Sequence, residues 1–195
     1  MDLESQTKWN NIYADATIGS YSVSRILTEN EHLLPQNGRA LEIACGTGSD
    51  SIFLAQRGLQ TDAWDISDTV VAKLNQFAEE NQLSIIAESR DINVQPPEDE
   101  TYDVIVIAHF LERKIAPTLI SALKPGGLLF YQTFVKEVTP NYSGPSNPAF
   151  RLDTNELLQL FPGMQIVVYR EEGLIGDISK GFRNEVMLVA RKYIV

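Results

Sequence analysis

The chain has 195 residues and a formal net charge of −10 at pH 7, a length that suits one hydrophobic core better than two. This acidic balance argues against a nucleic-acid partner, because a face that binds phosphates must concentrate Lys and Arg. No apolar run approaches the roughly 20 residues that a membrane-spanning helix requires, so we expect no membrane partner either.

The first residues and the cysteine content indicate a compartment. The sequence MDLESQTKWN is acidic and polar, whereas a secretory signal is basic and then apolar. Cys45 is the single cysteine and cannot form an internal disulfide, which agrees with a reducing environment. We therefore expect a cytoplasmic protein. For the oligomeric state we expect a monomer or a homodimer.

Residues 1–37 form an N-terminal segment ahead of the first strand pattern. Within it, Trp9 and Tyr13 fall at helical spacing. Together with Tyr21 they would close over a ligand if this segment is a lid, but aromatic stripes at helical spacing more often pack onto the core. The sequence leaves both interpretations open. We treat residues 1–37 as a helical lid segment attached to a core of residues 38–195.

From residue 38 onward, short apolar runs alternate with amphipathic stretches, which is typical of an α/β fold. Three runs are almost continuously apolar, as in parallel strands covered by helices on both faces: ALEIA (40–44), DVIVIA (103–108) and GLLFYQTF (127–134). Residues 67–81 carry an apolar helical stripe, with Ser67 placed as the N-cap. That stretch is predicted to be a covering helix.

The second half of the chain contains two helix signals. LKPGG (123–127) ends a helix and predicts a sharp turn into the next strand, because Pro and Gly supply fixed and positive φ values. Asp153 and Glu156 have capping-box spacing before LLQLF. Pro162 and Gly163 then end that second helix.

The last two apolar runs are MQIVVY (164–169) and EVMLVA (185–190), with no strong helix pattern between them. Parallel neighbours need a long crossover connection, usually a helix. These two strands are therefore predicted to pair antiparallel, which gives a mostly parallel sheet with one reversed strand.

The stretch RALEIACGTGSDSIFLA passes from a strand to a helix through Gly46 and Gly48. Such a turn brings backbone N–H groups close to a ligand at the carboxyl edge of the sheet. The next strand pattern, TDAWDIS, contains Asp65 near its end, and a carboxylate there accepts hydrogen bonds from ribose hydroxyls. The combination indicates a nucleoside-containing cofactor.

Two cofactors fit such a site, and neighbouring residues favour one of them. A dinucleotide fingerprint requires a third glycine where this chain has Ser51. The segment LEIACGTG instead resembles the first motif of class I S-adenosylmethionine-dependent methyltransferases, in which an acid precedes alternate glycines. Glu42, Gly46 and Gly48 match that motif, and Ala44 replaces its first glycine. We expect this departure to be mild, because alanine adds one methyl group.

The resemblance covers roughly Trp9 to Lys192 and implies a fold. It predicts a Rossmann-like, doubly wound seven-stranded α/β sheet of order 3-2-1-4-5-7-6 with strand 7 antiparallel, in a single methyltransferase domain over residues 1–195. YDVIVIAHFL resembles the family's fourth-strand motif, and LKPGG resembles the turn before strand five.

The same resemblance assigns cofactor-binding residues. Glu42 would organise the site around the cationic amino-acid end of S-adenosylmethionine, and Asp65 would bind its ribose. Asp91 would lie near the adenine amino group, between Ile66 and Ile92 on the two faces of the ring. The complete predicted cofactor set is Glu42, Ala44, Gly46, Gly48, Asp65, Ile66, Asp91, Ile92 and Ala108.

Acceptor-side residues are predicted after strand four and beyond strand five. His109 would accept a proton from a hydroxyl or amine acceptor, or else would only pack or supply a backbone carbonyl. Tyr142, Arg151 and Arg183 are candidate substrate contacts, and the arginines would suit an anionic acceptor. A solvated loop is the alternative for each of them. Cys45 is interpreted as a packing residue rather than a nucleophile.

Two longer runs, HFLERKIAPTLISALKPGGLLFYQTF and GPSNPAFRLDTNELLQLF, resemble small bacterial methyltransferases related to tellurite-resistance proteins. The resemblance implies methyl transfer from S-adenosylmethionine to a small molecule by in-line displacement. No metal site is expected, since the chain has two histidines and one cysteine. The alternatives are a non-catalytic S-adenosylmethionine-binding module and an NAD-dependent oxidoreductase, which Ser51 disfavours. An RNA methyltransferase is disfavoured by the net charge.

Overall fold

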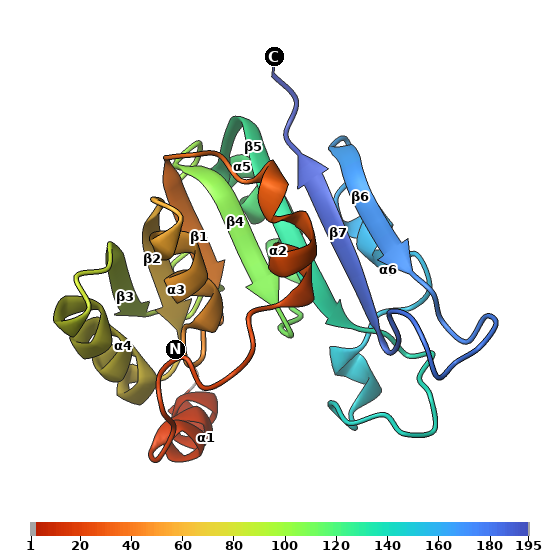
Figure 1. The fold of residues 1–195 in the computed structure, drawn as a ribbon, viewed down its shortest axis with the longest axis horizontal. Coiled ribbons are helices and arrows are strands. Elements are labelled where there is room, and N and C mark those ends of the chain that lie inside the picture. Colours follow the sequence, from red (N-terminus) through yellow and green to blue (C-terminus); the bar gives the residue numbers. More distant parts are fainter. Residues whose placement is uncertain (1–2, 195) are drawn as a thin grey trace.

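The computed structural model describes residues 3–194, so the outermost positions of the predicted 1–195 domain lie outside the described range. Its centre is one seven-stranded sheet (Figure 1). The strands are β1 (Arg39–Ile43), β2 (Gln60–Asp65), β3 (Ile85–Ser89), β4 (Tyr102–Ala108), β5 (Leu123–Phe134), β6 (Gln165–Glu171) and β7 (Glu185–Arg191). The helices are α1 (Leu3–Tyr13), α2 (Arg25–Asn30), α3 (Ser49–Gln56), α4 (Asp68–Glu80), α5 (Ala116–Ala122) and α6 (Glu156–Leu160). Short 3-10 turns occupy Glu31–Leu33, Arg113–Ile115 and Pro148–Phe150.

The strand order is β3-β2-β1-β4-β5-β7-β6. The first five strands in the chain pair in parallel, and β7 runs antiparallel to both β5 and β6. The predicted order and its reversed strand are confirmed. In the β5–β7 pair, Phe134 at the end of β5 lies opposite Glu185 at the start of β7.

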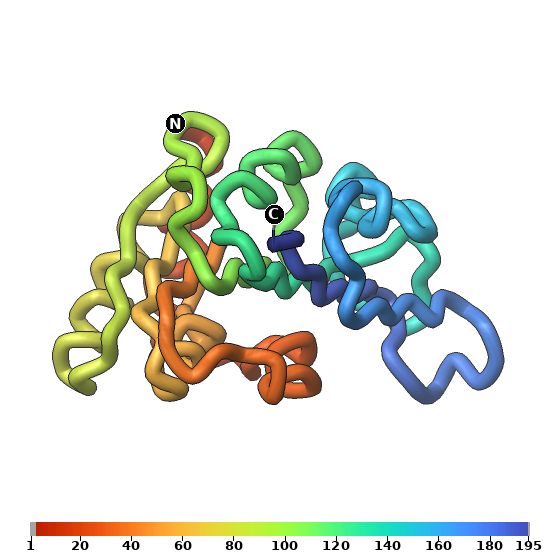
Figure 2. The backbone as a smooth tube through the Cα atoms, turned by 90° about the horizontal axis from the view of Figure 1, so that it is seen from above, coloured from red at the N-terminus to blue at the C-terminus, as the bar shows by residue number. Residues whose placement is uncertain are grey.

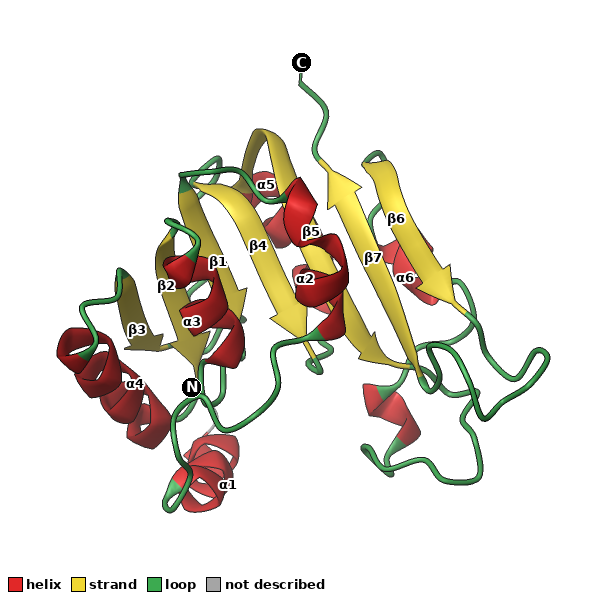
Figure 3. Ribbon diagram, viewed as in Figure 1, coloured by secondary structure: helices red, strands yellow, loops and turns green. Residues whose placement is uncertain are grey.

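Strand β4 shows how the sheet divides the core, because successive side chains of a strand point to opposite faces. Val104 and Val106 pack in the cluster beneath α2 and α3. Ile105 and Ile107 belong to the cluster beneath α5 and α6. Figure 2 shows these helix pairs on the two sides of the sheet, and Figure 3 shows α4 beside β3 at one end. Over residues 3–194, no helix has the length and apolarity needed to cross a bilayer.

Helix α4 begins as predicted, with Ser67 Oγ accepting a hydrogen bond from Val70 N–H at 3.3 Å. The helix before LKPGG ends as predicted, because α5 ends at Ala122 and β5 begins at Leu123. The chain turns within this first part of β5: Gly126 has a φ of 82°, and the pairing with β4 shifts register between Leu123 and Leu128. Two backbone bonds join this turn to the residue after β7. Gly126 N–H donates to the Lys192 carbonyl, and Lys192 N–H donates to the Gly127 carbonyl, both at 2.9 Å.

Only half of the predicted capping box of α6 forms. Asp153 N–H donates to Glu156 Oε2 at 2.7 Å. The Asp153 carboxylate pairs with Lys136 Nζ at 2.7 Å instead of capping the helix, and Asn155 precedes the helix with a φ of 61°. The ion pair has therefore displaced one of the two reciprocal bonds of the motif.

Candidate active site

The turn between β1 and α3 lies against the end of β2. Gly46 and Gly48 have φ values of 51° and 75° there, which L side chains rarely adopt. Gly46 N–H donates to Asp65 Oδ2 at 2.9 Å, so the turn is fastened to the neighbouring strand. A Cβ at Gly48 would lie 2.6 Å from Leu74 Cδ1. This glycine therefore also permits α3 and α4 to pack closely.

Ala44 departs from the sequence expectation in its backbone conformation. Its φ is 56°, in the left-handed region where a Cβ costs roughly 1–2 kcal/mol. The expectation that alanine replaces the motif's glycine at little cost is wrong, because the positive φ strains the backbone at Ala44. The methyl group itself packs at the edge of the core. His109, which follows β4, has a φ of 58°. Two neighbouring strands thus leave the sheet through strained residues, as functional sites often do.

Three carboxylates lie beside this turn. Glu42 in β1, Asp50 in the first turn of α3 and Asp65 at the end of β2 are 4%, 4% and 6% exposed. Within residues 3–194, none of them forms an ion pair with a lysine or arginine. Buried carboxylates normally have such a partner or become neutral. The cluster is therefore electrostatically incomplete.

Hydrogen bonds orient the three carboxylates without neutralising them. Glu42 accepts a bond from Ser51 Oγ, which gives the serine a function at the position where a dinucleotide site has glycine. Asp50 accepts a bond of 2.7 Å from Ser24 N–H, and these residues are 26 positions apart. Sequence reasoning missed Asp50, because no local pattern places Ser24 beside it. Asp65 is held by the glycine turn.

Burial raises the pKa of all three carboxyl groups. For Glu42, the charges of Asp50 and Asp65 raise the pKa further, against the hydrogen bond from Ser51. A positive charge among the carboxylates would reverse these shifts, because an opposite charge stabilises the ionised form. The donor set therefore fits a ligand that carries an ammonium or sulfonium group.

The other predicted cofactor residues follow neighbouring strands at the same edge. Ile66 and Asp91 come after β2 and β3, Ala108 ends β4, and all three are half-buried. Ile92 differs, because it is 7% exposed and packs in the same core cluster as Trp64. The structure brings the first three residues to one sheet edge and gives Ile92 a core contact that the sequence did not predict.

Helix α1 packs against α4 below the carboxyl edge of the sheet (Figure 1). Trp9 stacks on Tyr13 with ring centroids 5.6 Å apart. The Tyr13 hydroxyl lies 3.0 Å from the point where a Cβ of Gly46 would be, and burial raises its pKa. Lys73 Nζ of α4 donates to the carbonyls of Tyr13, the last residue of α1, and of Ala14 and Ala16 just after it, the shortest bond being 2.6 Å. Helix α1 is therefore fastened over the glycine turn.

The predicted acceptor side of the edge is built on the ends of β4, β5 and β7. The His109 side chain is 45% exposed, and its Nε2 lies 3.1 Å from Glu185 Oε2. The imidazole stacks on Phe134 with centroids 4.9 Å apart, and Phe134 meets Tyr142 edge-on at 6.0 Å. The Arg151 guanidinium lies 5.6 Å from the Tyr142 ring centroid. Three predicted acceptor-side residues thus form one continuous group.

Arg183 lies between β6 and β7, as predicted, but its contacts are within the connecting loop. Its guanidinium donates to backbone carbonyls around the β6–β7 loop: those of Lys180, Glu172, Gly173 and Asp177. The side chain is 13% exposed, and its contacts favour a structural role in the loop. Sequence reasoning missed Glu185, the residue that contacts His109. One feature points to Glu185, namely the antiparallel register that sets this residue opposite Phe134.

Cys45 is buried in the glycine turn, and burial raises the pKa of its thiol. A nucleophilic cysteine needs nearby positive charge to stabilise the thiolate, whereas Glu42 and Asp65 add negative charge. These observations favour the packing role. Across the described part of the chain, no group of three or more His, Cys, Asp or Glu side chains is arranged to hold a metal ion.

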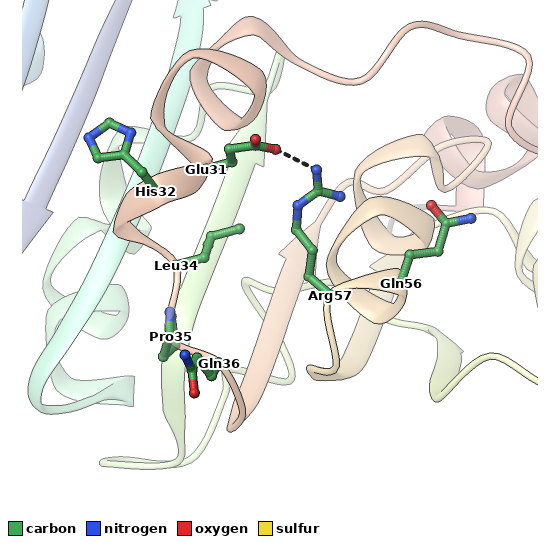
Figure 4. A pocket seen from close by; sticks show the side chains of 7 residues that line it. All are labelled: Glu31, His32, Leu34, Pro35, Gln36, Gln56 and Arg57. Carbon is green, nitrogen blue, oxygen red and sulfur yellow. Dashed lines mark hydrogen bonds and ion pairs between the residues drawn. The ribbon is translucent and has the colours of Figure 1, made fainter.

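A recess of about 510 Å³ lies at the opposite edge of the sheet (Figure 4), lined by Glu31, His32, Leu34, Pro35, Gln36, Gln56 and Arg57. These residues belong to the segment before β1 and to the end of α3. Glu31 and Arg57 form an ion pair across the recess. Because these two charges neutralise each other, we place the functional site at the carboxyl edge, where the carboxylates lack a cation.

Comparison with known proteins identifies a family over most of the chain. The family described as "Tellurite resistance protein TehB" matches residues 11–188. The "Probable S-adenosyl-L-methionine-dependent methyltransferase TehB" of Haemophilus influenzae is 29% identical over 154 residues, which cover 75% of this chain and 52% of the relative. The chain thus spans about half the length of that relative.

Solved structures share the fold. The crystal structure of TehB from Haemophilus influenzae has a TM-score of 0.68 at 24% identity, over 86% of this chain and 61% of that chain. Geranyl diphosphate C-methyltransferase from Streptomyces coelicolor, solved with Mg2+, geranyl diphosphate and S-adenosyl-L-homocysteine, has a TM-score of 0.69 at 14% identity and covers 97% of both chains. These likenesses show a shared fold.

Ala44→Gly is expected to stabilise the protein. Removing the left-handed Cβ recovers roughly 1–2 kcal/mol, of which the greater freedom of glycine in the unfolded chain offsets about 0.4–1 kcal/mol. A net gain of about 1 kcal/mol would raise the Tm by about 2–4 °C in a chain of this size. Differential scanning calorimetry measures the change, with Ala72→Gly on the exposed side of α4 as a control that should lower the Tm. A lower Tm for Ala44→Gly would show that no strain is present.

Glu42→Gln is expected to stabilise the ligand-free protein at neutral pH, because it removes a buried charge and keeps an acceptor for Ser51. A carboxyl group with a raised folded-state pKa holds its proton after the unfolded chain has lost it. Stability therefore falls as pH rises from the unfolded pKa of about 4.3 through the folded value. Urea midpoints between about pH 4 and about pH 8 should fall more for the wild type than for the variant. Parallel curves would contradict this account.

Proposed function

The chain belongs to the tellurite resistance protein TehB family of S-adenosylmethionine-dependent methyltransferases, and we propose that it transfers a methyl group from this cofactor to a small-molecule acceptor. The observation that carries the proposal is the group of three buried carboxylates that lack a cation beside the glycine turn. The net charge of −10 supports a small acceptor rather than a nucleic acid.

Glu42 and the glycine turn are proposed to hold the amino-acid end of the cofactor, and Asp65 is proposed to bind the ribose. The other proposed cofactor contacts are Ala44, Gly46, Gly48, Ile66, Asp91, Ile92 and Ala108. Bound S-adenosylmethionine supplies a methyl group on a cationic sulfur, which the acceptor's lone pair displaces in line with the carbon–sulfur bond. The chain's own contribution is alignment and exclusion of water, worth up to roughly 7–11 kcal/mol in favourable cases.

The acceptor is proposed to lie beside His109, which would take its proton, on the wall formed by Phe134, Tyr142 and Arg151. The Arg151 Nε–H is buried and makes no hydrogen bond in the part of the chain that the structure describes. An unused donor next to an aromatic ring supports an anionic group on the acceptor. Arg183 is proposed to shape this side through the β6–β7 loop.

Residues 1–37 are proposed to act as a lid on the core of residues 38–195, within one domain. The contact of Tyr13 with the space above Gly46 supports this role, and so does the attachment of α1 to Lys73. A ligand that approaches the glycine turn would require α1 to shift, and α1 would then enclose it. Water would be excluded from the reacting atoms as a result.

Isothermal titration calorimetry with S-adenosylhomocysteine tests the cofactor assignment. The wild type should bind this compound and should give no heat with NAD. Asp65→Asn should weaken binding about tenfold or more, because hydrogen bonds to a charged group contribute about 1.5–3 kcal/mol. Asp177→Asn, an exposed carboxylate of the β6–β7 loop, is the charge-matched control and should bind normally. Heat with NAD alone would overturn the proposal.

The transfer step is tested with radiolabelled S-adenosylmethionine and a panel of thiols, phenols and tellurite. Incorporation of label into at least one small acceptor is expected. Tight binding of S-adenosylhomocysteine without transfer to any acceptor would instead support a non-catalytic binding module.

Lys73→Gln should loosen the lid, because it removes a charged donor from three carbonyls of the α1 end. Hydrogen exchange of α1 amides is expected to quicken about tenfold, the factor that corresponds to about 1.4 kcal/mol. Lys136→Gln, which breaks an ion pair remote from α1, is the control and should leave these amides unchanged. Equal exchange of α1 in Lys73→Gln and the wild type would refute the attachment.

A further inference from the structure

A network of hydrogen bonds joins helix α2 to His109 across the sheet. Ile26 N–H of α2 donates to Gln132 Oε1 at 2.8 Å. Gln132 Nε2 donates to Glu185 Oε2 at 2.5 Å, and His109 Nε2 lies 3.1 Å from the same oxygen. Gln132 is 2% exposed, so the network belongs to the packed interior until it reaches the histidine.

The network determines which nitrogen of His109 carries a proton. A backbone N–H only donates, so the bond from Ile26 assigns the Gln132 amide oxygen to α2 and the amide nitrogen to Glu185. An ionised Glu185 only accepts. His109 Nε2 is therefore the donor in its bond to Glu185, and Nδ1 of the neutral ring is left as an acceptor. Among residues 3–194, Nδ1 makes no hydrogen bond.

Backbone and packing hold the imidazole in this orientation. His109 N–H donates to the Gln132 carbonyl at 2.9 Å, and the ring stacks on Phe134 at 4.9 Å. His109 has a positive φ of 58°. A strained conformation of this kind is kept only where surrounding contacts hold it in place, as this hydrogen bond and ring stacking do. The charge of Asp50 also acts on this imidazole. His109 therefore lies where the carboxylate cluster and the aromatic wall meet.

We propose that Glu185, itself oriented by Gln132, is a positioning residue that keeps His109 able to accept a proton at Nδ1, and that the methyl acceptor is a hydroxyl or thiol compound. This inference rests on the proposed methyl transfer. The oxygen–hydrogen or sulfur–hydrogen bond of the acceptor breaks and the proton goes to Nδ1. The electron pair left on the acceptor forms the bond to the methyl group, and the former carbon–sulfur pair stays on the cofactor's sulfur. An acceptor atom without a proton, as in tellurite, gains nothing from this arrangement.

The charges around His109 set the pH range in which the base works. Burial lowers the pKa of His109, but the hydrogen bond and charge of Glu185 and the charge of Asp50 outweigh it, so the pKa is raised. Burial raises the pKa of Glu185, but His109, Gln132 and Arg25 outweigh it and the pKa is lowered. His109 accepts a proton only when neutral. The rate should therefore rise with pH through a value above about 6.5.

Histidine NMR titration tests the positioning role without any acceptor. The chain has two histidines, so His32 is the internal reference. In Glu185→Gln, the pKa of His109 should fall, because the hydrogen bond and the charge of Glu185 that raise it are removed. Glu79→Gln removes the same charge from the exposed side of α4 and should leave the titration of His109 unchanged. An unchanged His109 titration in a Glu185→Gln protein that binds S-adenosylhomocysteine normally would overturn the proposal.

Methylation kinetics with a phenol and a thiol give the second readout. Glu185→Gln should lower kcat about tenfold to a hundredfold, change KM less than about twofold, and move the pH inflection downward. Glu185→Asp, which keeps the charge, should recover part of the loss and serves as the second variant if Glu185→Gln does not fold. A purely structural role would leave the inflection in place. An unmoved inflection, or transfer to tellurite in preference to every hydroxyl and thiol, would refute the proposal.

The two proposals fail in distinguishable ways. If the wild type does not bind S-adenosylhomocysteine, the proposed function fails and the acceptor assignment fails with it. If binding and transfer are normal but the titration of His109 is insensitive to Glu185→Gln, only the role of Glu185 is overturned.

Discussion

The proposed functional site depends on three buried carboxylates that, within residues 3–194, form no ion pair with a lysine or arginine. Burying unpaired charge costs several kcal/mol per ion, so neutral residues at Glu42, Asp50 and Asp65 would serve stability better. The chain instead surrounds them with N–H and O–H donors, which fix their orientation but supply no positive charge. A cation bound there would be stabilised by all three. A sulfonium-bearing cofactor supplies such a charge beside a backbone turn that permits close approach.

The same sheet edge is divided into two halves by the ends of β1 and β4. Ala44 turns the chain into the proposed cofactor half, and His109 turns it toward the proposed acceptor wall, both in left-handed conformations. The segment before β1 contacts both halves, because Ser24 binds Asp50 and Ile26 binds Gln132. This segment therefore fixes the positions of the carboxylate cluster and the His109 network relative to each other.

The strands could be predicted from the sequence because their determinants are local, whereas their order in the sheet followed from the resemblance to class I methyltransferases. Continuous apolar runs specify strands that are covered on both faces, and Ser67 caps α4 through a bond to a residue three positions away. The incomplete capping box at Asp153 could not be predicted from local spacing. Lys136, which follows β5, forms an ion pair with the Asp153 carboxylate and so draws it away from the helix N-terminus. The pairing of Glu185 with His109 joins residues 76 positions apart. Only the register of the folded sheet brings them together, and sequence spacing does not encode it.

A crystal structure of the protein grown with S-adenosylmethionine tests the central claim most directly. The account predicts the amino-acid end of the cofactor within hydrogen-bonding distance of Glu42 or Asp50, and the ribose hydroxyls on Asp65. A cofactor seated in the recess between Glu31 and Arg57, or a carboxyl edge that stays empty at saturating concentration, would contradict it.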